Sequence, residues 1–115
     1  MATITPTVTI TDNVPSVTWT GITTTTDTPS AFAIQDQAGL AMSVQFAGTF
    51  NGGTTAVLQG SNDGSTYTTL KDVLGNSVSA TAAALFEVSS SVRYIKPSVS
   101  SGSADNVNVI VVLRG

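Results

Sequence analysis

The chain has 115 residues, of which only 10% are charged, and its formal net charge is −3. This length allows one domain with one modest core, and the charged fraction is far below the roughly 25% of an ordinary soluble domain. Ionised side chains are depleted at the centres of protein interfaces, so we interpret the low charge and the positive mean hydropathy of +0.27 as signs of assembly with other protein surfaces.

The same composition excludes several classes of function. With no His and no Cys, the chain contains no Ser-His-Asp or Cys-His arrangement and no thiolate or imidazole metal site. We therefore expect no enzyme activity, no cofactor and no metal. The four cationic residues are scattered, which argues against direct nucleic-acid binding, and no apolar run approaches the roughly 20 residues of a membrane span. The first ten residues also lack the pattern of a secretion signal.

Residues 3–11 alternate between threonine and mostly apolar side chains, which predicts a half-buried strand. A turn at Asp12 and Asn13 leads to a second alternating segment around Val17 and Trp19, and the two segments are expected to pair as a hairpin. Residues 21–30 contain four consecutive threonines and Pro29, which predicts an extended linker or exposed loop. We therefore expect residues 1–30 to form an N-terminal β arm or hairpin with a linker, and residues 31–115 to form the main domain.

The middle of the chain predicts several short strands. A short strand at Phe32 and Ile34 is followed by a turn at residues 35–39 and by a longer strand that runs to Phe50. The glycines that follow Asn51 favour a tight hairpin, which would pair this strand with residues 54–61. Turns are then predicted at residues 62–64 and 75–76. The Ala-rich residues 79–85 are equally consistent with one helical turn and with an irregular crossover.

The C-terminal third predicts three more strands. Two are short, around residues 86–88 and 92–95, and Pro97 indicates a sheet edge or a bulge. The last, residues 106–114, has four apolar residues on one face and Ile110 and Val112 on the other, a pattern typical of a strand buried on both sides. Seven to nine short strands predict an all-β fold, a single β-sandwich of immunoglobulin-like size with jelly-roll or Greek-key wiring and an extended N-terminal arm or hairpin.

A few motifs permit a functional reading beside a structural one. The seven carboxylates are isolated in the sequence, so paired-carboxylate catalysis of the glycosidase type would require folding to bring two together. The segment Asn62-Asp63-Gly64 offers oxygen ligands suited to calcium, but EF-hand spacing is absent and a turn is the better interpretation. Glycines 48, 52, 53 and 60 fit hairpins and bulges rather than a phosphate-binding loop. Trp19 is more consistent with packing than with stacking on a sugar.

These patterns indicate two interaction surfaces, one on the threonine-rich first strand and one on the outer face of the last. A threonine-rich strand offers hydroxyl and backbone groups that can extend a neighbouring sheet. The expected protein-interface residues are Thr3, Thr5, Thr7, Thr9, Thr11, Trp19, Ile110 and Val112.

The segment from Val44 to Val112 resembles small structural proteins of tailed bacteriophages. It contains VQFAGTFNGGTTAVLQGSNDGSTYTTL and, after a variable stretch, VRYIKPSVSSGSADNVNVIVV. These contain a GS-DG--Y--L hairpin, an RYI-P-V strand and a valine-rich last strand. This combination is similar to capsid decoration (cement) proteins, with the cyanophage type as one candidate, while residues 1–40 carry no such likeness.

The resemblance implies a role and no catalytic residues. Decoration proteins attach to the major capsid protein on the outer surface of the virion, commonly as homotrimers, and are made in the host cytoplasm. By this resemblance we expect a virion structural protein that stabilises a capsid, with no direct contact to nucleic acid or membrane. The alternatives are a phage tail or fibre domain and a carbohydrate-binding β-sandwich module.

Overall fold

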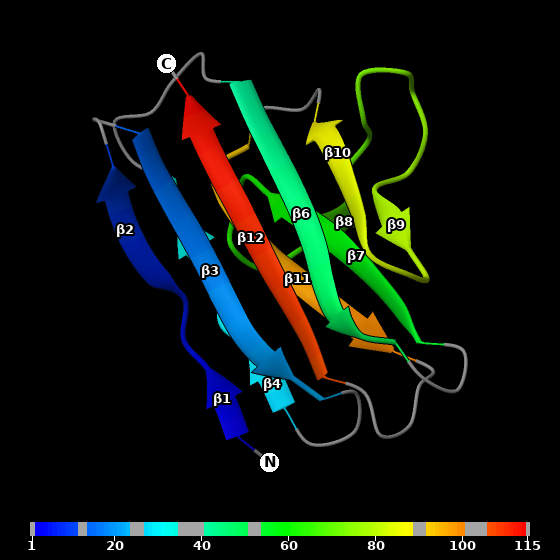
Figure 1. Ribbon diagram of the computed structural model, residues 1–115. Coiled ribbons are helices and arrows are strands. Elements are labelled where there is room, and N and C mark those ends of the chain that lie inside the picture. Colours follow the sequence, from blue (N-terminus) through cyan, green and yellow to red (C-terminus); the bar gives the residue numbers. More distant parts are fainter. Residues whose placement is uncertain are drawn as a thin grey trace.

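The computed structural model describes residues 2–11, 14–23, 27–34, 41–50, 54–88, 92–100 and 106–114, and the statements below concern those residues. They form strands and turns and no helix, which confirms the all-β prediction. Two antiparallel sheets pack face to face as a sandwich (Figure 1). None of the described residues belongs to a helix that is long and apolar enough to cross a membrane.

The sheet nearest the viewer in Figure 1, called the front sheet below, has five antiparallel strands. Its central strand is β12, which pairs with β3 on one side and with β6 on the other. The edge strands are β2, next to β3, and β10, next to β6. In spatial order the strands are β10 (Ala84–Val88), β6 (Ala41–Thr49), β12 (Asn106–Arg114), β3 (Val14–Ile22) and β2 (Thr7–Thr11).

The second sheet, called the back sheet, lies behind the first and is built around β7 and β11. Two short strands pair with β7, and one pairs with the start of β11. The strands are β5 (Phe32–Ala33), β11 (Tyr94–Ser100), β7 (Thr55–Ser61), β8 (Thr68–Thr69) and β9 (Ser79–Ala80). A separate parallel pair joins β1 (Ala2–Ile4) to β4 (Asp27–Pro29). Pro97, predicted to mark an edge or a bulge, lies on β11 beyond the two residues that pair with β5.

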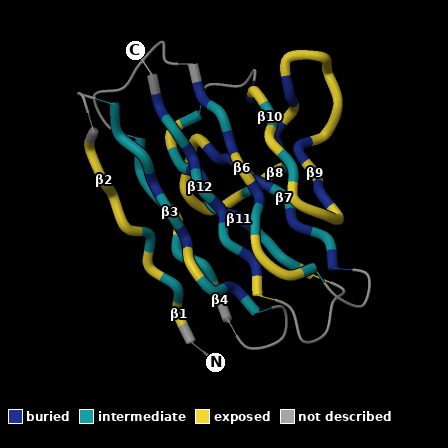
Figure 2. Tube along the Cα trace, in the orientation of Figure 1, coloured by how far each residue is buried: buried dark blue, intermediate teal, exposed yellow. Residues whose placement is uncertain are grey.

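The core lies between the two sheets, and β12 contributes a continuous row of side chains to it. The inward residues predicted for this strand, Val107, Val109, Val111 and Leu113, are 0–2% exposed. Because side chains alternate along a strand, all four point to the same side. Phe46 packs beside them and meets Phe86 in an edge-to-face contact with ring centroids 5.9 Å apart. Buried residues run along the middle strands, whereas β2 is exposed over most of its length (Figure 2).

The expected hairpin between residues 41–50 and 54–61 is wrong. The two segments are β6 and β7, which lie in different sheets, and the predicted turn at residues 51–53 is outside the described residues. Both edges of β6 are occupied by β12 and β10. β6 and β7 instead face each other across the core, where Val44 and Leu58 are both fully buried. An alternating strand pattern specifies an apolar face, and it does not specify a pairing partner.

The prediction for the N-terminal segment is partly wrong. The predicted hairpin of β2 with β3 is present, with its turn outside the described residues. However, β3 is not part of an arm that leaves the sandwich, because it pairs with β12 and buries Val17, Trp19 and Ile22 at 0–1% exposure. Gly21 and Ile22, expected to begin the linker, therefore belong to β3. Residues 27–29 are extended but are paired with β1, and the Ser30 N–H donates to the Ile4 carbonyl at 2.9 Å.

The Ala-rich segment contains no helical turn. Residues 79–80 form β9, residues 81–83 bend, and β10 begins at Ala84. A short run of alanines cannot pay the nucleation cost of a helix by itself, while β10 gains five paired positions against β6. The alternation that starts at Ala84 places Phe86 and Val88 toward the core and leaves Leu85 71% exposed.

Replacement of Gly48 tests the close approach of β6 to β12. Gly48 has φ +104°, and a Cβ there would overlap the backbone carbonyl oxygen of Asn106. We expect Gly48→Ala to lower the free energy of unfolding by about 2–3 kcal/mol, measured by urea denaturation followed by circular dichroism. The neighbouring Thr49→Ala, at an exposed position, is the matched control and should change stability by less than about 0.5 kcal/mol. Equal stability of the two variants would contradict the packing described.

Candidate functional site

The outer face of the front sheet is the candidate interaction surface, and we call it the front face. Paired residues in adjacent antiparallel strands lie on the same side of a sheet, so the register defines rows across all five strands. One row is Thr7, Thr18, Ile110, Gln45 and Leu85, and the next is Thr9, Ser16, Val112, Ser43 and Glu87. Folding therefore brings four of the predicted interface residues, from opposite ends of the chain, onto one face.

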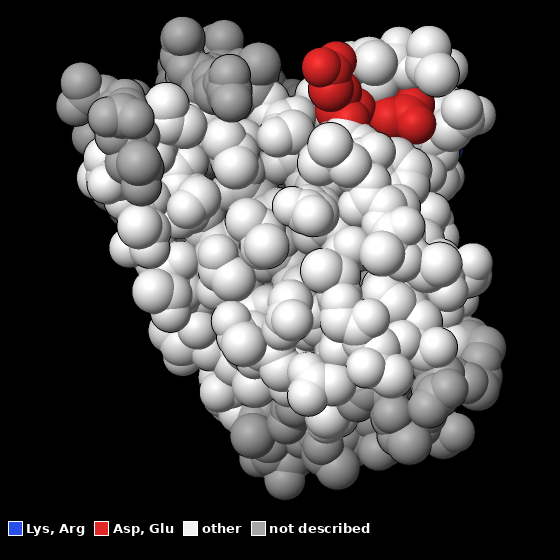
Figure 3. Space-filling view, in the orientation of Figure 1, with Lys and Arg blue, Asp and Glu red and all other residues white. Residues whose placement is uncertain are grey.

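Among its described side chains, the front face is almost free of charge. Of the ten residues in the two rows, Glu87 alone is ionisable. Figure 3 shows this face without a visible basic group and with acidic side chains only at one corner, over β10. Ile110 and Val112 are half-buried between their neighbours on β3 and β6. In Figure 1 no described strand lies in front of β12, so the predicted cover for its outer face does not come from the described part of this chain.

The other predicted interface residues have different locations. Thr3 and Thr5 are exposed, on β1 and on the link that follows it, and the side chain of Thr11 is outside the described residues. Trp19 is 0% exposed, and its indole N–H donates to the Ser30 carbonyl at 2.8 Å. Trp19 is therefore a core residue and is not available to a partner. Its inward position follows from its pairing with Val109 of β12.

β2 provides a second feature, a sheet edge to which no other described strand is paired. It pairs with β3 on one side, and it ends the order of the front sheet. Val8 and Ile10 lie on its inner side but beyond the edge of the core, where they are 48% and 67% exposed. The strand contains no charged residue. An edge of this kind lacks the lysines and bulges that usually prevent strand addition.

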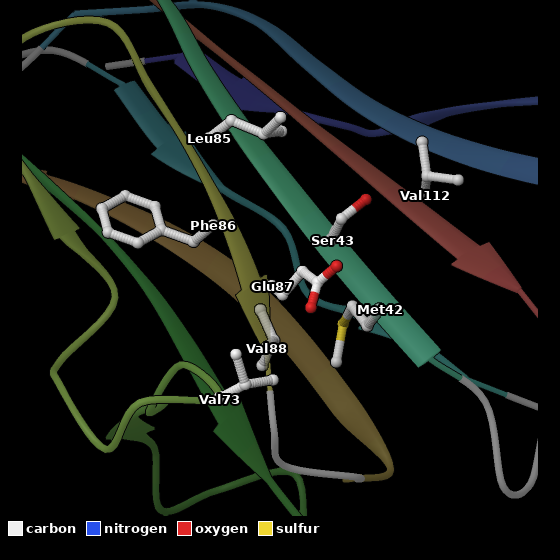
Figure 4. Close-up of a pocket in the computed structure, with 8 residues that line it drawn as sticks. All are labelled: Met42, Ser43, Val73, Leu85, Phe86, Glu87, Val88 and Val112. Atoms are coloured by element: carbon white, nitrogen blue, oxygen red, sulfur yellow. The ribbon is translucent and has the colours of Figure 1, made fainter.

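A pocket of about 470 Å³ opens at the corner of the front face where β6, β10 and the loop at residues 71–77 meet. Figure 4 shows that its lining comes from these three elements and from β12. Six of the eight lining residues are apolar, and Glu87 and Ser43 are the polar ones. The lining residues are Met42, Ser43, Val73, Leu85, Phe86, Glu87, Val88 and Val112.

The loop beside the pocket is held by one carboxylate. Asp72 Oδ1 accepts hydrogen bonds from the N–H groups of Leu74 and Asn76, each at 2.9 Å. The Asp72 N–H also donates to the Asn76 carbonyl at 2.7 Å. On the other side, the Val73 N–H donates to the Glu87 carbonyl at 3.0 Å and joins the loop to β10. These bonds hold Val73 and Leu74 at the surface, where they are 57% and 82% exposed.

The segment considered for calcium is a turn built around Asp63. Its Oδ1 accepts hydrogen bonds from the Thr66 N–H at 2.9 Å, the Ser65 N–H at 2.8 Å and the Ser61 hydroxyl at 2.7 Å. These bonds, led by that of Thr66, lower the pKa of Asp63 from its usual 3.8 to about 2. The carboxylate thus satisfies backbone donors of its own turn. Among the described residues, no group of three or more acidic side chains is placed to hold a metal ion.

The three candidate residues for an aromatic sugar platform do not form one surface. Trp19 is buried. Lys96 Nζ lies 4.3 Å from the centre of the Tyr67 ring and covers that face. Tyr94 packs close to Gly64, so its ring lies against the turn that contains Asp63. Stacking on a sugar needs exposed, coplanar faces, and these residues do not supply them together.

Sequence reasoning missed Val73, Leu85 and the polar residues of β6 that lie on the front face. Leu85 lies in the Ala-rich segment, for which the sequence allows two interpretations, although its alternation with Phe86 indicates a strand. Val73 carries no local signal, because its position depends on the contact between a loop and β10.

Neither a protein-family model nor a curated protein matches this chain. Among solved structures, the chain is similar to the SPBc2 prophage-derived protein YomS, with a TM-score of 0.61 and 13% sequence identity. The match covers 93% of this chain and 99% of that chain. At this identity the likeness shows a shared fold.

The depressed pKa of Asp63 predicts a specific acid sensitivity. A carboxyl group with a lower pKa in the folded state stabilises the fold fully above its unfolded-state value near 3.8, and this contribution is lost as the pH falls through about 2. Between pH 4 and pH 2, the free energy of unfolding of the wild type should therefore fall more steeply than that of Asp63→Asn. Urea denaturation at half-unit pH steps measures this difference. Parallel curves for the two proteins would rule out the assigned hydrogen bonds.

Proposed function

We propose that this chain is a non-enzymatic virion structural protein of a bacteriophage, which binds and stabilises the outer surface of the capsid as a homo-oligomer. The observation that carries the proposal is the front face, which is nearly uncharged in its described side chains and has Ile110 and Val112 at its centre. The fold shared with a prophage-derived protein supports a phage origin. The decoration-protein motifs in the sequence support the capsid role.

The front face has the size and chemistry of a protein interface. Strands lie about 4.8 Å apart and rise about 3.3 Å per residue, so five strands of five to nine residues cover about 500–700 Å². A standard interface buries about 800 Å² per partner. Burial of serine, threonine and glutamine side chains costs less than burial of charged groups, provided that they find hydrogen-bond partners. A capsid protein with polar uncharged groups would supply those partners.

The motifs that resemble decoration proteins have a structural role in the back sheet. The pairing of β7 with β11 joins Ser61 to Tyr94, and the Arg93 N–H donates to the Asn62 side chain at 3.2 Å. The motif residues thus fix the turn at residues 61–66 against the start of β11. This arrangement leaves the front face free for a partner.

A charge placed at the centre of the front face tests the capsid-binding surface. Val112→Lys puts an ammonium group among uncharged residues, where a partner would have to desolvate it. We expect its affinity for empty expanded capsids to fall at least tenfold in co-sedimentation, with an unchanged circular dichroism spectrum. Thr68→Lys, at an exposed position on β8 in the back sheet, is the matched control and should bind like the wild type. Equal capsid affinity of the two variants would refute the assignment of the front face.

The proposed homo-oligomer has a direct test in solution. Sedimentation velocity of the purified protein at micromolar concentration should give a mass that is a multiple of the 11.7 kDa chain, and the decoration-protein resemblance favours three copies. A monomer at every concentration, with intact binding to capsids, would contradict the oligomer and leave capsid attachment in place.

A further inference from the structure

We propose that the pocket at the β10 corner of the front face is a docking site for a segment of another protein that presents a large apolar side chain next to a Lys or Arg. The inference names the chemistry of a partner at the front face, so its role in the virion rests on the proposed function. Binding of such a segment is a property of this chain alone and is testable without a capsid.

The pocket has room for a large apolar side chain. Leu85 and Val73 stand at the rim, 71% and 57% exposed, and Val112 borders the pocket on the side of the front face. Met42 and Val88, which are opposite each other in the β6–β10 pair, turn their side chains toward the core and border the floor of the pocket at 5% and 7% exposure. In Figure 4 Leu85 and Glu87 extend from one side of β10 and Phe86 from the other. Its volume of about 470 Å³ lies within the usual range of ligand pockets.

The charge at the pocket favours a cation beside that apolar group. Glu87 is exposed and lies opposite Ser43 in the same row, and no ion pair of Glu87 is present in the described part of the chain. In Figure 4 its carboxylate lies between the apolar walls. Attraction between this exposed carboxylate and a cation weakens as salt is added. An acidic segment would instead be repelled.

The pocket is also preorganised, which reduces the cost of binding. Val73 forms one wall, and the Asp72 hydrogen bonds and the bond to the Glu87 carbonyl hold its backbone. Gly75 has φ +87° and closes the same turn, with its N–H donating to the Asp72 carbonyl at 3.0 Å. A partner side chain therefore enters a pocket in which this wall is already in position.

A second copy of this chain does not supply the required segment. Its four cations each follow an apolar residue in the sequence, but three of those apolar residues, Leu70, Ile95 and Leu113, are 0–5% exposed. The fourth, Val92, is half-buried against the Gly60 region of the back sheet, and Tyr94, which follows Arg93, is half-buried with its ring next to Gly64. The occupant is therefore a different protein.

The test is a titration of the ¹⁵N-labelled full chain with capped tetrapeptides, in which binding is monitored through the amide chemical shifts in NMR spectra. The sequence Gly-Phe-Lys-Gly is compared with Gly-Phe-Glu-Gly and Gly-Ser-Lys-Gly. We expect Gly-Phe-Lys-Gly to shift the amides of Ser43, Val73 and Glu87 saturably, with a dissociation constant on the order of 1–10 mM. At low salt the other two peptides should bind at least about threefold more weakly. Glu87→Gln, an exposed and nearly isosteric change, should remove the preference for Lys over Glu and retain the preference for Phe over Ser.

Several results would overturn the proposal: no saturable shift at these amides, a stronger response elsewhere, or equal affinity for the Lys and Glu peptides. These results are distinguishable from failure of the proposed function. A protein that binds capsids through the front face but not the peptide refutes the pocket assignment alone. A protein that binds the peptide but no capsid retains the pocket and loses the capsid role.

Discussion

The position of β12 at the centre of the front sheet is the constraint on which the rest of the structure depends. It is paired along its length with β6 and over most of its length with β3, so the last strand of the chain joins an early strand to a middle one. Its inward valines then fill the gap between the sheets. Once this strand is in place, β2 and β10 become the two edges of the sheet, and the outer residues of five strands are aligned in rows.

The core and the candidate interface are two sides of that same strand. Val109 and Val111 are fully buried, whereas Ile110 and Val112 point the other way and are half-buried between uncharged neighbours. An apolar side chain on the solvent side of a central strand has no folding role comparable to that of the core valines. Its presence amid an uncharged face is consistent with burial against another protein.

Two of the described carboxylates, those of Asp63 and Asp72, stabilise turns. Asp63 and Asp72 each accept hydrogen bonds from backbone N–H groups of their own turns, and each turn joins strands of the back sheet or its connection to β10. Glu87 differs, because its side chain lies at the pocket on the front face. These described carboxylates thus lie away from the centre of the candidate interface.

The sequence by itself determined where most strands lie and which of their faces is apolar. Alternation is a local property, so the inward row of β12, the β2–β3 hairpin and the turns at Asp63 and Gly75 could be read from neighbouring residues. Only the tertiary structure decided which strands pair. The same pattern on residues 41–50 fits a hairpin with residues 54–61 or a place beside β12, and Trp19 fits a partner surface or the core. Long-range pairing decided both cases, because β12 pairs with both β6 and β3 and so fixes which of their faces meets the core. For the same reason Val73, Leu85 and Val112 could be placed around one pocket only after folding.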